Sequence, residues 1–504
     1  MIEKNIEFCS DRLKFSGISL QDAENLVKWR SDENIIKYFL NPTPVTMEQH
    51  LSWFNNYLKN TTRYDFIIRI KENNTPIGVV GISSIDYSNK TCEINYALGE
   101  NAYHNKGYAS EAVSSLINFS IKMLDIDSFF AEIHENNLAS ENLIKKMGFV
   151  KTSYKDNFNI FEKVIKKIYF RVDGNEKIGT GHIMRCLSIA EAARDKNNKC
   201  IFIVADIKMA SIISSKGFSF ICIDSVWNDL DKEIIKMRSL IEKEQIEKLF
   251  VDSYFVTQKY MYELSLKTKV IYIDDLFNSI FSCHTLINYN CYADSIPYKE
   301  NYFNIDLLVG TIYAPLRKEF VNLPAFEVKN EVTNILITTG GTDLYNAASK
   351  ITRKLLPLID KEIHIYIISG RFNEHLEELR SIENSDKRVK IFTGVEKMSE
   401  LILQCDVAVS AGGSTLYELS ACGIPTVMFV MADNQLLAYK SITKELMLGG
   451  GNMLEDENAC INGIVDNIQT LIKDKTLRQV LSRKMQSAVD GKGAQRIVDN
   501  VTNN

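Results

Sequence analysis

Apolar and polar positions follow an irregular order up to about residue 160. Helical spacing of apolar residues predicts helices over 20–39 and 46–59, and strand-like runs follow in "YDFIIRIK", "TPIGVVGISSID" and "TCEINYALG". A helix over 107–124, the strand "FFAEIHE" and a helix over 139–147 come next. This order predicts an α+β domain in which helices flank a strand-rich sheet.

The pattern changes near Lys166, where short apolar strands begin to alternate with helices. The first set runs from "KKIYFRVDG" to "CHTLINY", and a second set starts after Pro324 with "VTNILITTGG" and ends with "PTVMFVM". Two such sets predict two doubly wound parallel sheets of the α/β class, in which ligands bind beyond the carboxyl ends of the strands. We therefore expect three domains, over 1–163, 167–325 and 326–504.

Composition narrows the function classes. The net charge of −5 argues against a nucleic-acid-binding protein, whose surface is normally basic. The ten cysteines include no CxxC pair, which argues against a zinc site, and several lie in apolar runs typical of buried thiols. The chain shows no signal-peptide pattern and no apolar run long enough to span a bilayer. We expect a cytoplasmic enzyme of small molecules, with no membrane or nucleic-acid partner.

Small residues gather at the start of the helix predicted over 107–124. Gly107, Ala109 and Ser110 leave backbone N–H groups accessible at a helix amino terminus, where the helix dipole also favours an anion. A pyrophosphate group fits such a site.

The order of strand, phosphate loop, helix, strand, Asn, helix and Gly-Phe over residues 5–155 resembles the GNAT superfamily of N-acetyltransferases. The family's Gln/Arg-x-x-Gly-x-Gly/Ala loop maps onto 104–109, with His104 in place of the usual Gln or Arg, and Gly148-Phe149 matches its closing signature. The resemblance implies acetyl-CoA as co-substrate. The residues expected to bind it are His104, Asn105, Lys106, Gly107, Tyr108, Ala109, Asn137 and Asn142.

The acid and base of acetyl transfer are less clear from the sequence. In this family the acceptor amine attacks the thioester directly, so a proton must be removed and the thiolate reprotonated. Many members carry a tyrosine where this chain has Ile144, which leaves the acid unassigned. Glu93 is either a base acting through water or a solvated strand carboxylate, and His134 and Tyr154 are weaker candidates.

The segment "YFRVDGNEKIGTGHIMRCL" suggests a catalytic histidine. A strand ends at 173–174, a loop carries Gly179, Thr180 and Gly181, and His182 opens a helix. The helix dipole disfavours a protonated imidazole there and keeps it in the neutral form that a general base needs. The alternative is a histidine that only caps the helix, but the glycines at a sheet's carboxyl edge favour function.

The second set of strands supplies two more glycine turns, "ITTGG" and "SAGGST". The second turn begins a helix and can cradle a diphosphate, and a carboxylate one turn further on can accept hydrogen bonds from ribose hydroxyls. The alternative is that the glycines only pack strand against helix. The residues expected to bind the substrate on this side are Gly340, Gly341, Gly412, Gly413, Ser414, Thr415, Glu418, Asn434 and Gln435.

Residues 167–500 are similar to two-domain GT-B enzymes, among them the lipid-II-forming N-acetylglucosaminyltransferases, and resemble more closely the UDP-sugar hydrolase family of the pseudaminic acid pathway. The resemblance implies that His182 is the base, that Tyr254 acts beside the sugar and that Asn434 lines the nucleotide side. The matching signature consists of Arg171, Asp173, Gly179, Gly181, His182, Arg185, Cys186 and Leu187. The residues expected to bind the substrate in this segment are Arg171, Asp173, Gly179, Thr180, Gly181 and Arg185.

The reaction implied by this resemblance is inverting hydrolysis at the anomeric carbon without a metal ion. His182 deprotonates water, and the turn over 412–415 stabilises the departing diphosphate. Asp274-Asp275 suggests a metal site, but we interpret the pair as the end of a strand.

The two resemblances fit one pathway. There, a GNAT-type enzyme acetylates the 4-amino group of a UDP-4-amino-4,6-dideoxy sugar, and the hydrolase then cleaves the UDP-2,4-diacetamido-2,4,6-trideoxy product. The sequence thus suggests a bifunctional enzyme. The alternatives are a GT-B glycosyltransferase fused to an acetyltransferase, or a nucleotide-sugar-binding protein without activity. A related bacillosamine or legionaminic acid intermediate would use similar residues.

Overall fold

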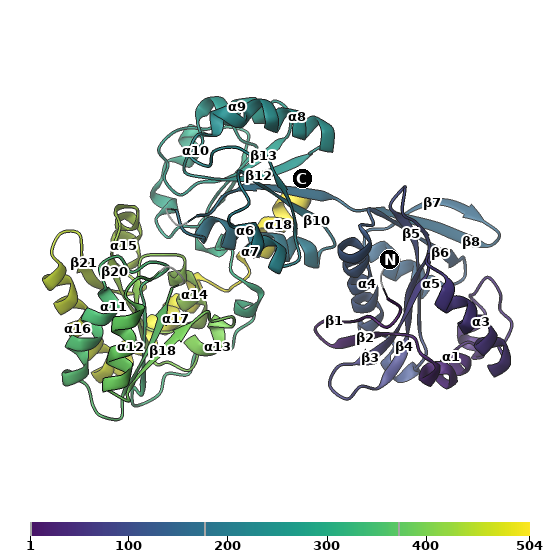
Figure 1. Cartoon of the computed structure of the whole chain (residues 1–504), viewed down its shortest axis with the longest axis horizontal. Helices are drawn as coiled ribbons and strands as arrows, with labels where there is room; N and C mark the ends of the chain where they lie inside the picture. The colour runs from purple at the N-terminus through teal and green to yellow at the C-terminus, as the bar shows by residue number, and fades with distance from the viewer. Residues whose placement is uncertain (1–2, 176–177, 371–372, 504) are drawn as a thin grey trace. The chain divides into compact units, whose positions relative to one another are not determined.

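The computed structural model describes residues 3–175, 178–370 and 373–503 (Figure 1). Its chain divides into two compact units. The first comprises Met1–Lys166 with Arg194–Lys199, and the second comprises Lys167–Ala193 with Cys200–Asn504. The boundary expected near residue 325 lies inside the second unit.

The first unit is built on one mixed sheet with the strand order β1-β2-β3-β4-β5-β6-β8-β7. Neighbouring strands are antiparallel except β5 and β6, which are parallel. The strands are β1 (Glu7–Cys9), β2 (Leu13–Gly17), β3 (Tyr64–Ile70), β4 (Pro76–Asp86), β5 (Thr91–Leu98), β6 (Ser128–His134), β7 (Val150–Lys155) and β8 (Phe158–Val164). The helices are α1 (Ala23–Trp29), α2 (Glu33–Ile36), α3 (Met47–Lys59), α4 (Tyr108–Leu124) and α5 (Leu138–Lys146).

The helix predicted over 20–39 is interrupted. A short 3-10 turn precedes α1, and α2 begins separately because the Asp32 side chain accepts a hydrogen bond from the Asn34 N–H and starts a new helix. The helix predicted over 46–59 is α3, and Thr46 with Gln49 forms a capping box at its start.

Strands β5 and β6 pair over three positions and then separate. The last pair is Glu93 with Phe130, although the two strands continue to Leu98 and His134. Beyond Glu93 their facing edges carry backbone groups that are not paired with each other, and these groups are available to a ligand. Helix α4 packs on this sheet through buried Ala112, Val113, Leu116 and Ile117, which repeat at helical spacing.

The second unit contains two parallel sheets, with the orders β11-β10-β9-β12-β13-β14-β15 and β18-β17-β16-β19-β20-β21. The strands of the first sheet are β9 (Lys167–Val172), β10 (Lys199–Val204), β11 (Ser219–Cys222), β12 (Lys248–Asp252), β13 (Lys269–Ile273), β14 (Thr285–Asn288) and β15 (Asp306–Val309). Those of the second are β16 (Asn334–Thr338), β17 (His364–Ser369), β18 (Val389–Thr393), β19 (Val407–Ala411), β20 (Thr426–Val430) and β21 (Leu448–Asn452).

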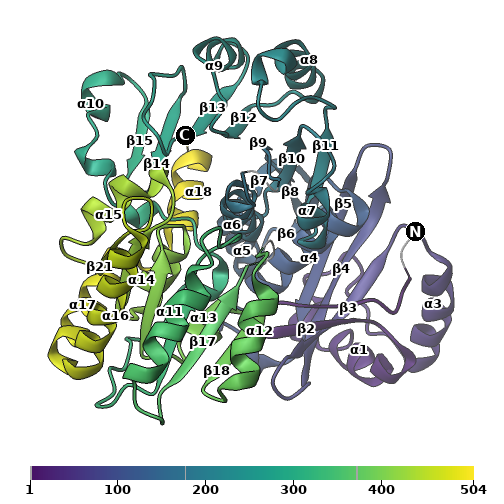
Figure 2. The same cartoon turned by 60° about the vertical axis from the view of Figure 1, so that its left-hand side comes forward.

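Helices connect these strands, and Figure 2 shows the second sheet with α12 beside β18. The helices of the first half are α6 (Gly181–Asp195), α7 (Ala210–Ser215), α8 (Ile234–Glu244), α9 (Gln258–Ser265) and α10 (Tyr298–Asn301). Those of the second half are α11 (Ala347–Leu355), α12 (Leu376–Ser385), α13 (Met398–Ile402), α14 (Thr415–Cys422), α15 (Leu436–Ile442), α16 (Glu457–Lys473), α17 (Lys475–Ala488) and α18 (Gly493–Asn503). The predicted fold class is confirmed: a mixed sheet flanked by helices is followed by two doubly wound parallel sheets.

Each parallel sheet reverses its strand order at one point. In the first sheet this switch point lies between β9 and β12, and in the second between β16 and β19. Open α/β sheets bind ligands in the crevice that forms beyond the strand ends at such a point. The segments that follow these four strands are therefore where a site is expected in each sheet.

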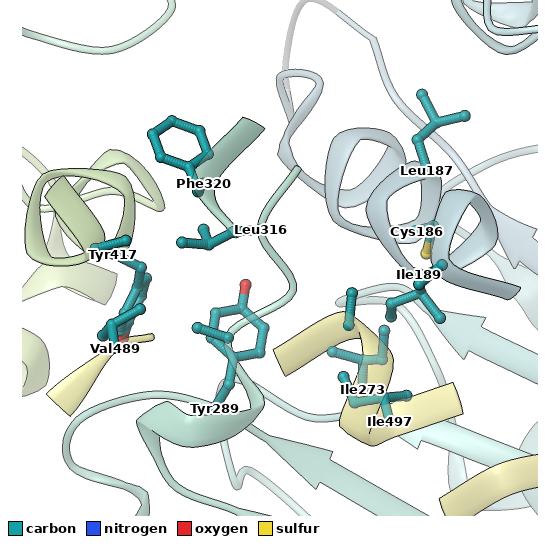
Figure 3. Packing of buried hydrophobic residues seen from close by; sticks show 14 of the residues in the cluster. Cys186, Leu187, Ile189, Ile273, Tyr289, Leu316, Phe320, Tyr417, Val489 and Ile497 are labelled. Carbon is teal, nitrogen blue, oxygen red and sulfur yellow. The ribbon is translucent and has the colours of Figure 1, made fainter. Parts of the chain in front are cut away.

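The last helix, α18, packs against the first half of the unit. Its buried residue Ile497 belongs to the same apolar cluster as Ile273 of β13 and Ile189 of α6 (Figure 3). That cluster also includes Tyr417 and Val489 of the second half, so one core joins the two sheets of the unit.

Candidate functional site

The predicted phosphate loop of the first unit has the geometry of an anion site. Gly107 precedes α4 with φ of 80°, a left-handed conformation that glycine adopts without strain. No side chain caps this helix start. The first N–H groups of α4 are therefore accessible to a ligand, at the positive end of a 17-residue helix. His104 lies in the same loop and its Nε2 is 3.2 Å from the Leu98 carbonyl oxygen at the end of β5.

Arg12, which the sequence did not single out, fixes this loop. Its Nε donates to Glu111 of α4 at 2.7 Å, and its Nη1 donates to the Lys106 carbonyl at 3.1 Å. Its guanidinium also lies over the Tyr108 ring, 4.4 Å from the centroid. The arginine thus ties β2 to the loop. Arg12 and Glu111 are 99 residues apart in the chain, so sequence reasoning did not predict this contact.

The two predicted asparagines differ in their surroundings. Asn137 caps α5, because its Oδ1 accepts a hydrogen bond from the Ser140 N–H at 3.2 Å. Asn142 is exposed on the same helix. Asn137 therefore fixes the start of α5, and the Asn142 side chain faces solvent.

Glu93 stands where β5 and β6 separate. Its Oε2 accepts hydrogen bonds from Ser83 Oγ at 2.8 Å and Ser84 Oγ at 3.4 Å, and its side chain is half-buried. Burial, together with the nearby charge of Glu93, raises the pKa of Glu132. Tyr154, in contrast, is exposed and its hydroxyl donates to Glu135, while His134 Nδ1 accepts the Asn136 N–H.

The second unit places His182 in the first turn of α6, at the switch point of its sheet. The ring is 5% exposed, and Nδ1 lies 2.5 Å from Oδ1 of Asp252, which ends β12 and is fully buried. A carboxylate only accepts hydrogen bonds, so Nδ1 carries the proton and donates it to Asp252. In the neutral ring Nε2 then holds the lone pair, and none of the described residues hydrogen-bonds to Nε2.

Arg185, one turn after His182 on α6, holds Asp252 in place. Its Nε and Nη2 donate to the two carboxylate oxygens at 2.6 and 2.5 Å, and its Nη1 donates to Asp275 at 2.7 Å. Burial alone would raise the pKa of Asp252, but the charge of Arg185 and the hydrogen bonds from Arg185 and His182 outweigh it and hold this pKa well below its usual value. The sequence predicted a substrate contact for Arg185, whereas here its guanidinium faces two carboxylates and the Tyr289 hydroxyl.

Tyr254 covers the imidazole. Its ring meets His182 edge-on with centroids 4.4 Å apart, and its hydroxyl donates to Asp275 at 3.2 Å. Burial, with the charge of Asp275, raises the pKa of Tyr254, so the phenol remains protonated at neutral pH. The buried thiol of Cys186 lies below the pair and donates weakly to Asp252 at 3.5 Å.

Sequence reasoning missed Asp252 and interpreted Asp275 only as part of a strand end. Asp252 is the last residue of buried β12, in "LFVD", Asp275 follows buried β13, in "VIYIDD", and the two strands are parallel neighbours. Acidic residues at the carboxyl ends of adjacent parallel strands were the available signal. Asp274 is different: it is fully buried and accepts the Tyr298 hydroxyl and two backbone N–H groups, as a strand end would.

Arg171, which the sequence predicts to contact the substrate, is held by two buried carboxylates. The residue is 1% exposed, and its guanidinium donates to Glu233 at 2.6 and 2.8 Å and to Asp173 at 2.6 Å. A buried arginine with two carboxylates supports the loops that follow β9 and β10 from within the fold. Asp173 uses its second oxygen to accept the Ala205 N–H at 2.8 Å.

The glycines before His182 leave room around the loop. Gly179 has φ of 72°, and nothing lies within 4 Å of a Cβ placed on Gly179 or Gly181. Thr180 accepts the Met184 N–H through its carbonyl and so begins α6. Residues 176–177 lie outside the described part of this loop.

The glycine turns of the second sheet follow β16 and β19, the strands at its switch point. Gly340 has φ of 82°, and a Cβ on Gly340, Gly341 or Gly413 would meet no atom of the described residues within 4 Å. Gly412 instead packs closely, because a Cβ there would come within 2.9 Å of the Gln435 side chain. Gln435 in turn accepts the Met431 N–H at 2.8 Å, which fixes the loop that carries exposed Asn434.

Ser414 is exposed directly before α14, and Thr415 is the first residue of that helix. Glu418, one turn later, receives Arg317 Nη2 on Oε1 at 2.8 Å. Burial raises the pKa of Glu418, and the charge of Arg317 opposes this shift. Arg317 thus holds the carboxylate of Glu418, which the sequence predicts to accept hydrogen bonds from the ribose hydroxyls.

Among the described residues, no group of three or more His, Cys, Asp or Glu side chains is placed to hold a metal ion. None of the helices within the described ranges is both long and apolar enough to cross a bilayer.

Two family descriptions match the chain, one in each unit. Residues 12–150 match the acetyltransferase (GNAT) domain, and residues 334–501 match the glycosyltransferase family 28 C-terminal domain. The uncharacterized N-acetyltransferase p20 of Bacillus licheniformis is 32% identical over 146 residues, which are 28% of this chain and 81% of that protein. The chain therefore belongs to the GNAT acetyltransferase family through its first unit.

Other proteins are similar to the second unit of the chain. The uncharacterized protein MJ1062 of Methanocaldococcus jannaschii is 27% identical over 296 residues, which are 56% of this chain and 59% of that protein. The UDP-2,4-diacetamido-2,4,6-trideoxy-beta-L-altropyranose hydrolase of Campylobacter jejuni is 25% identical over 255 residues, 50% of this chain and 87% of the hydrolase. The chain spans about three-fifths of the first relative's length. A GNAT acetyltransferase domain is thus joined to a sugar-nucleotide-enzyme-like unit that is similar to this hydrolase.

Proposed function

We propose that the chain is a bifunctional enzyme of nonulosonic acid synthesis. Its first unit transfers an acetyl group from acetyl-CoA to the 4-amino group of a UDP-4-amino-4,6-dideoxy sugar. Its second unit hydrolyses the UDP-2,4-diacetamido-2,4,6-trideoxy sugar that results, giving UDP and the free sugar. The observation that carries the proposal is the buried Asp252–His182 pair at the switch point of a parallel sheet.

The pair suits His182 for general-base catalysis. Asp252 fixes the tautomer that leaves Nε2 free to accept a proton, and it stabilises the imidazolium that forms. Nε2 takes a proton from water, the hydroxide attacks the anomeric carbon, and the bond from that carbon to the UDP oxygen breaks. Attack opposite to UDP inverts the configuration.

The second half of the unit supports departure of UDP. The turn at Gly412, Gly413, Ser414 and Thr415, which is open at Gly413, offers N–H groups at the start of α14 to the diphosphate. Glu418 accepts the ribose hydroxyls, and Gly340, Gly341, Asn434 and Gln435 complete the proposed nucleotide site. In this proposal residues 167–325 hold the sugar and residues 326–504 hold the nucleotide.

In the first unit, over 1–163, the loop from His104 to Ala109 binds the pyrophosphate of acetyl-CoA. Asn137 and Asn142 contact the same cofactor. The acceptor amine attacks the thioester carbon, the carbon–sulfur bond breaks, and CoA leaves as a thiol after proton transfer. Glu93, at the point where β5 and β6 separate, removes the amine proton through a water molecule.

A glycosyltransferase is the second candidate, because residues 334–501 match a glycosyltransferase family domain. Such an enzyme would pass the sugar to an acceptor hydroxyl instead of water. Release of UDP without any acceptor separates the two functions, since only the hydrolase needs nothing but water.

The two steps are tested together by incubating the protein with acetyl-CoA and the 4-amino UDP-sugar. Mass spectrometry is expected to show CoA first and UDP afterwards. A His182→Asn variant is expected to release CoA at the normal rate and to accumulate the acetylated UDP-sugar. His364→Asn, at an exposed histidine of β17, is the matched control and retains both steps. CoA release by the wild type without later UDP release would reject the two-step proposal.

A further inference from the structure

A continuous set of hydrogen bonds runs from the His182 base to the helix of the proposed diphosphate site. It begins with Asp252 and Arg185, and Arg185 Nη1 donates to Oδ2 of Asp275 at 2.7 Å. The other oxygen of Asp275 accepts Asn290 Nδ2 at 3.2 Å. Asn290, after β14, is thus the last member of this set in the first half of the unit.

Tyr417 completes the connection from the second half. Its hydroxyl donates to Asn290 Oδ1 at 3.1 Å and accepts the Cys291 N–H at 3.3 Å. Both hydrogen-bonding roles of the hydroxyl are thereby used, so its orientation is fixed. The Tyr417 ring is 5% exposed and meets Tyr289 edge-on, with centroids 5.4 Å apart (Figure 3).

The place of Tyr417 in α14 gives this connection a consequence. The helix begins at Thr415 directly after the open glycine turn, and Glu418 is the next residue after Tyr417. A diphosphate bound at the glycine turn and a ribose bound to Glu418 would therefore contact the same helical turn that carries the Tyr417 hydroxyl. The opposite end of the connection fixes the carboxylate that orients His182.

We propose that Tyr417 is a positioning residue, which joins the diphosphate-binding end of α14 to the His182 base through Asn290, Asp275 and Arg185. This inference rests on the proposed hydrolysis. The connection keeps Arg185 and Asp252 in the orientation that holds the imidazole toward the sugar while the nucleotide is bound. Hydrogen-bonded groups that act as one unit lose their effect together when any link is cut.

The test is a double-mutant cycle on UDP release from the diacetamido UDP-sugar. Tyr417→Phe keeps the ring and removes the hydroxyl, and we expect kcat to fall roughly fivefold with KM nearly unchanged. Asp275→Asn is expected to lower kcat roughly 10- to 100-fold, because its hydrogen bonds include a charged partner. In the double variant, Tyr417→Phe is expected to add less than a further twofold.

Tyr439→Phe is the matched control, since the Tyr439 hydroxyl accepts the Gly451 N–H at 3.0 Å in the same half but outside the connection. This variant is expected to keep the wild-type kcat. Losses that multiply in the double variant, or an unchanged kcat in Tyr417→Phe, would overturn the inference. A wild type that releases no UDP, or a His182→Asn variant as active as wild type, would instead overturn the proposed hydrolysis.

Discussion

At the residue scale, the proposed hydrolysis depends on the buried pair of His182 and Asp252. Glycines and a histidine at a helix start are visible over a short stretch, whereas Asp252 lies 70 residues further along the chain. The same distance effect explains why the sequence alone gives no partner for Arg171. Its partner Glu233 is 62 residues away in the chain. A reader of the local sequence does not see this partner and therefore interprets the arginine as a substrate contact.

Removing the carboxylate beside the imidazole tests this pair. In Asp252→Asn the amide can offer its N–H to Nδ1, which favours the wrong tautomer and leaves Nε2 protonated. We expect kcat for UDP release to fall by roughly 100-fold or more, with a small change in KM. Steady-state kinetics on the diacetamido UDP-sugar measure both constants.

Asp386→Asn is the matched control, because Asp386 also has a pKa lowered by an arginine, Arg388, but lies at the end of α12 in the second half of the unit. It is expected to keep the wild-type rate. An Asp252→Asn variant that folds normally and turns over within threefold of wild type would show that the carboxylate does not orient the base.

At the element scale, the alternation of short apolar strands and helices was enough to predict two parallel sheets. The edge strands β15 and β21 were missed, because "DLLV" is only four residues long and "LGGGN" is rich in glycine. The split between β5 and β6 was also invisible. It depends on which strands pair and for how long, and local sequence does not encode that.

The phosphate loop of α4 depends on one backbone conformation. Gly107→Ala is expected to cost about 1 kcal/mol of stability, since alanine is strained at φ of 80°. The shifted loop should raise the KM for acetyl-CoA by roughly tenfold, because hydrogen bonds to a charged phosphate are lost. UDP release from sugar that is already acetylated should not change.

Gly148→Ala separates strain from binding. Gly148 has φ of 83°, and a Cβ there meets no described atom within 4 Å, whereas a Cβ on Gly107 would make an ordinary contact with Arg12 Nη2 at 3.4 Å. The two variants therefore carry the same backbone cost in the same unit. If Gly148→Ala raised the KM for acetyl-CoA as much as Gly107→Ala does, the loop would have no special part in binding.

At the scale of the whole molecule, the chain divides into two compact units, each of which matches a different family domain. Each unit has its own core and its own predicted site, and the comparisons assign the first unit to the GNAT family. The sequence predicted this division because the change from mixed to alternating elements is abrupt near Lys166. Nothing local predicted the return of α18 to the first parallel sheet, since that packing depends on contacts between residues far apart in the chain.

The central claim, hydrolysis by water at the anomeric carbon, is tested most directly in ¹⁸O-labelled water. The protein is given the diacetamido UDP-sugar and no acceptor, UDP is analysed by mass spectrometry, and the sugar anomer is followed by NMR before it equilibrates. We predict unlabelled UDP and a first-formed sugar of inverted configuration. Label in the UDP, retention of configuration, or no UDP release without an acceptor would contradict the account.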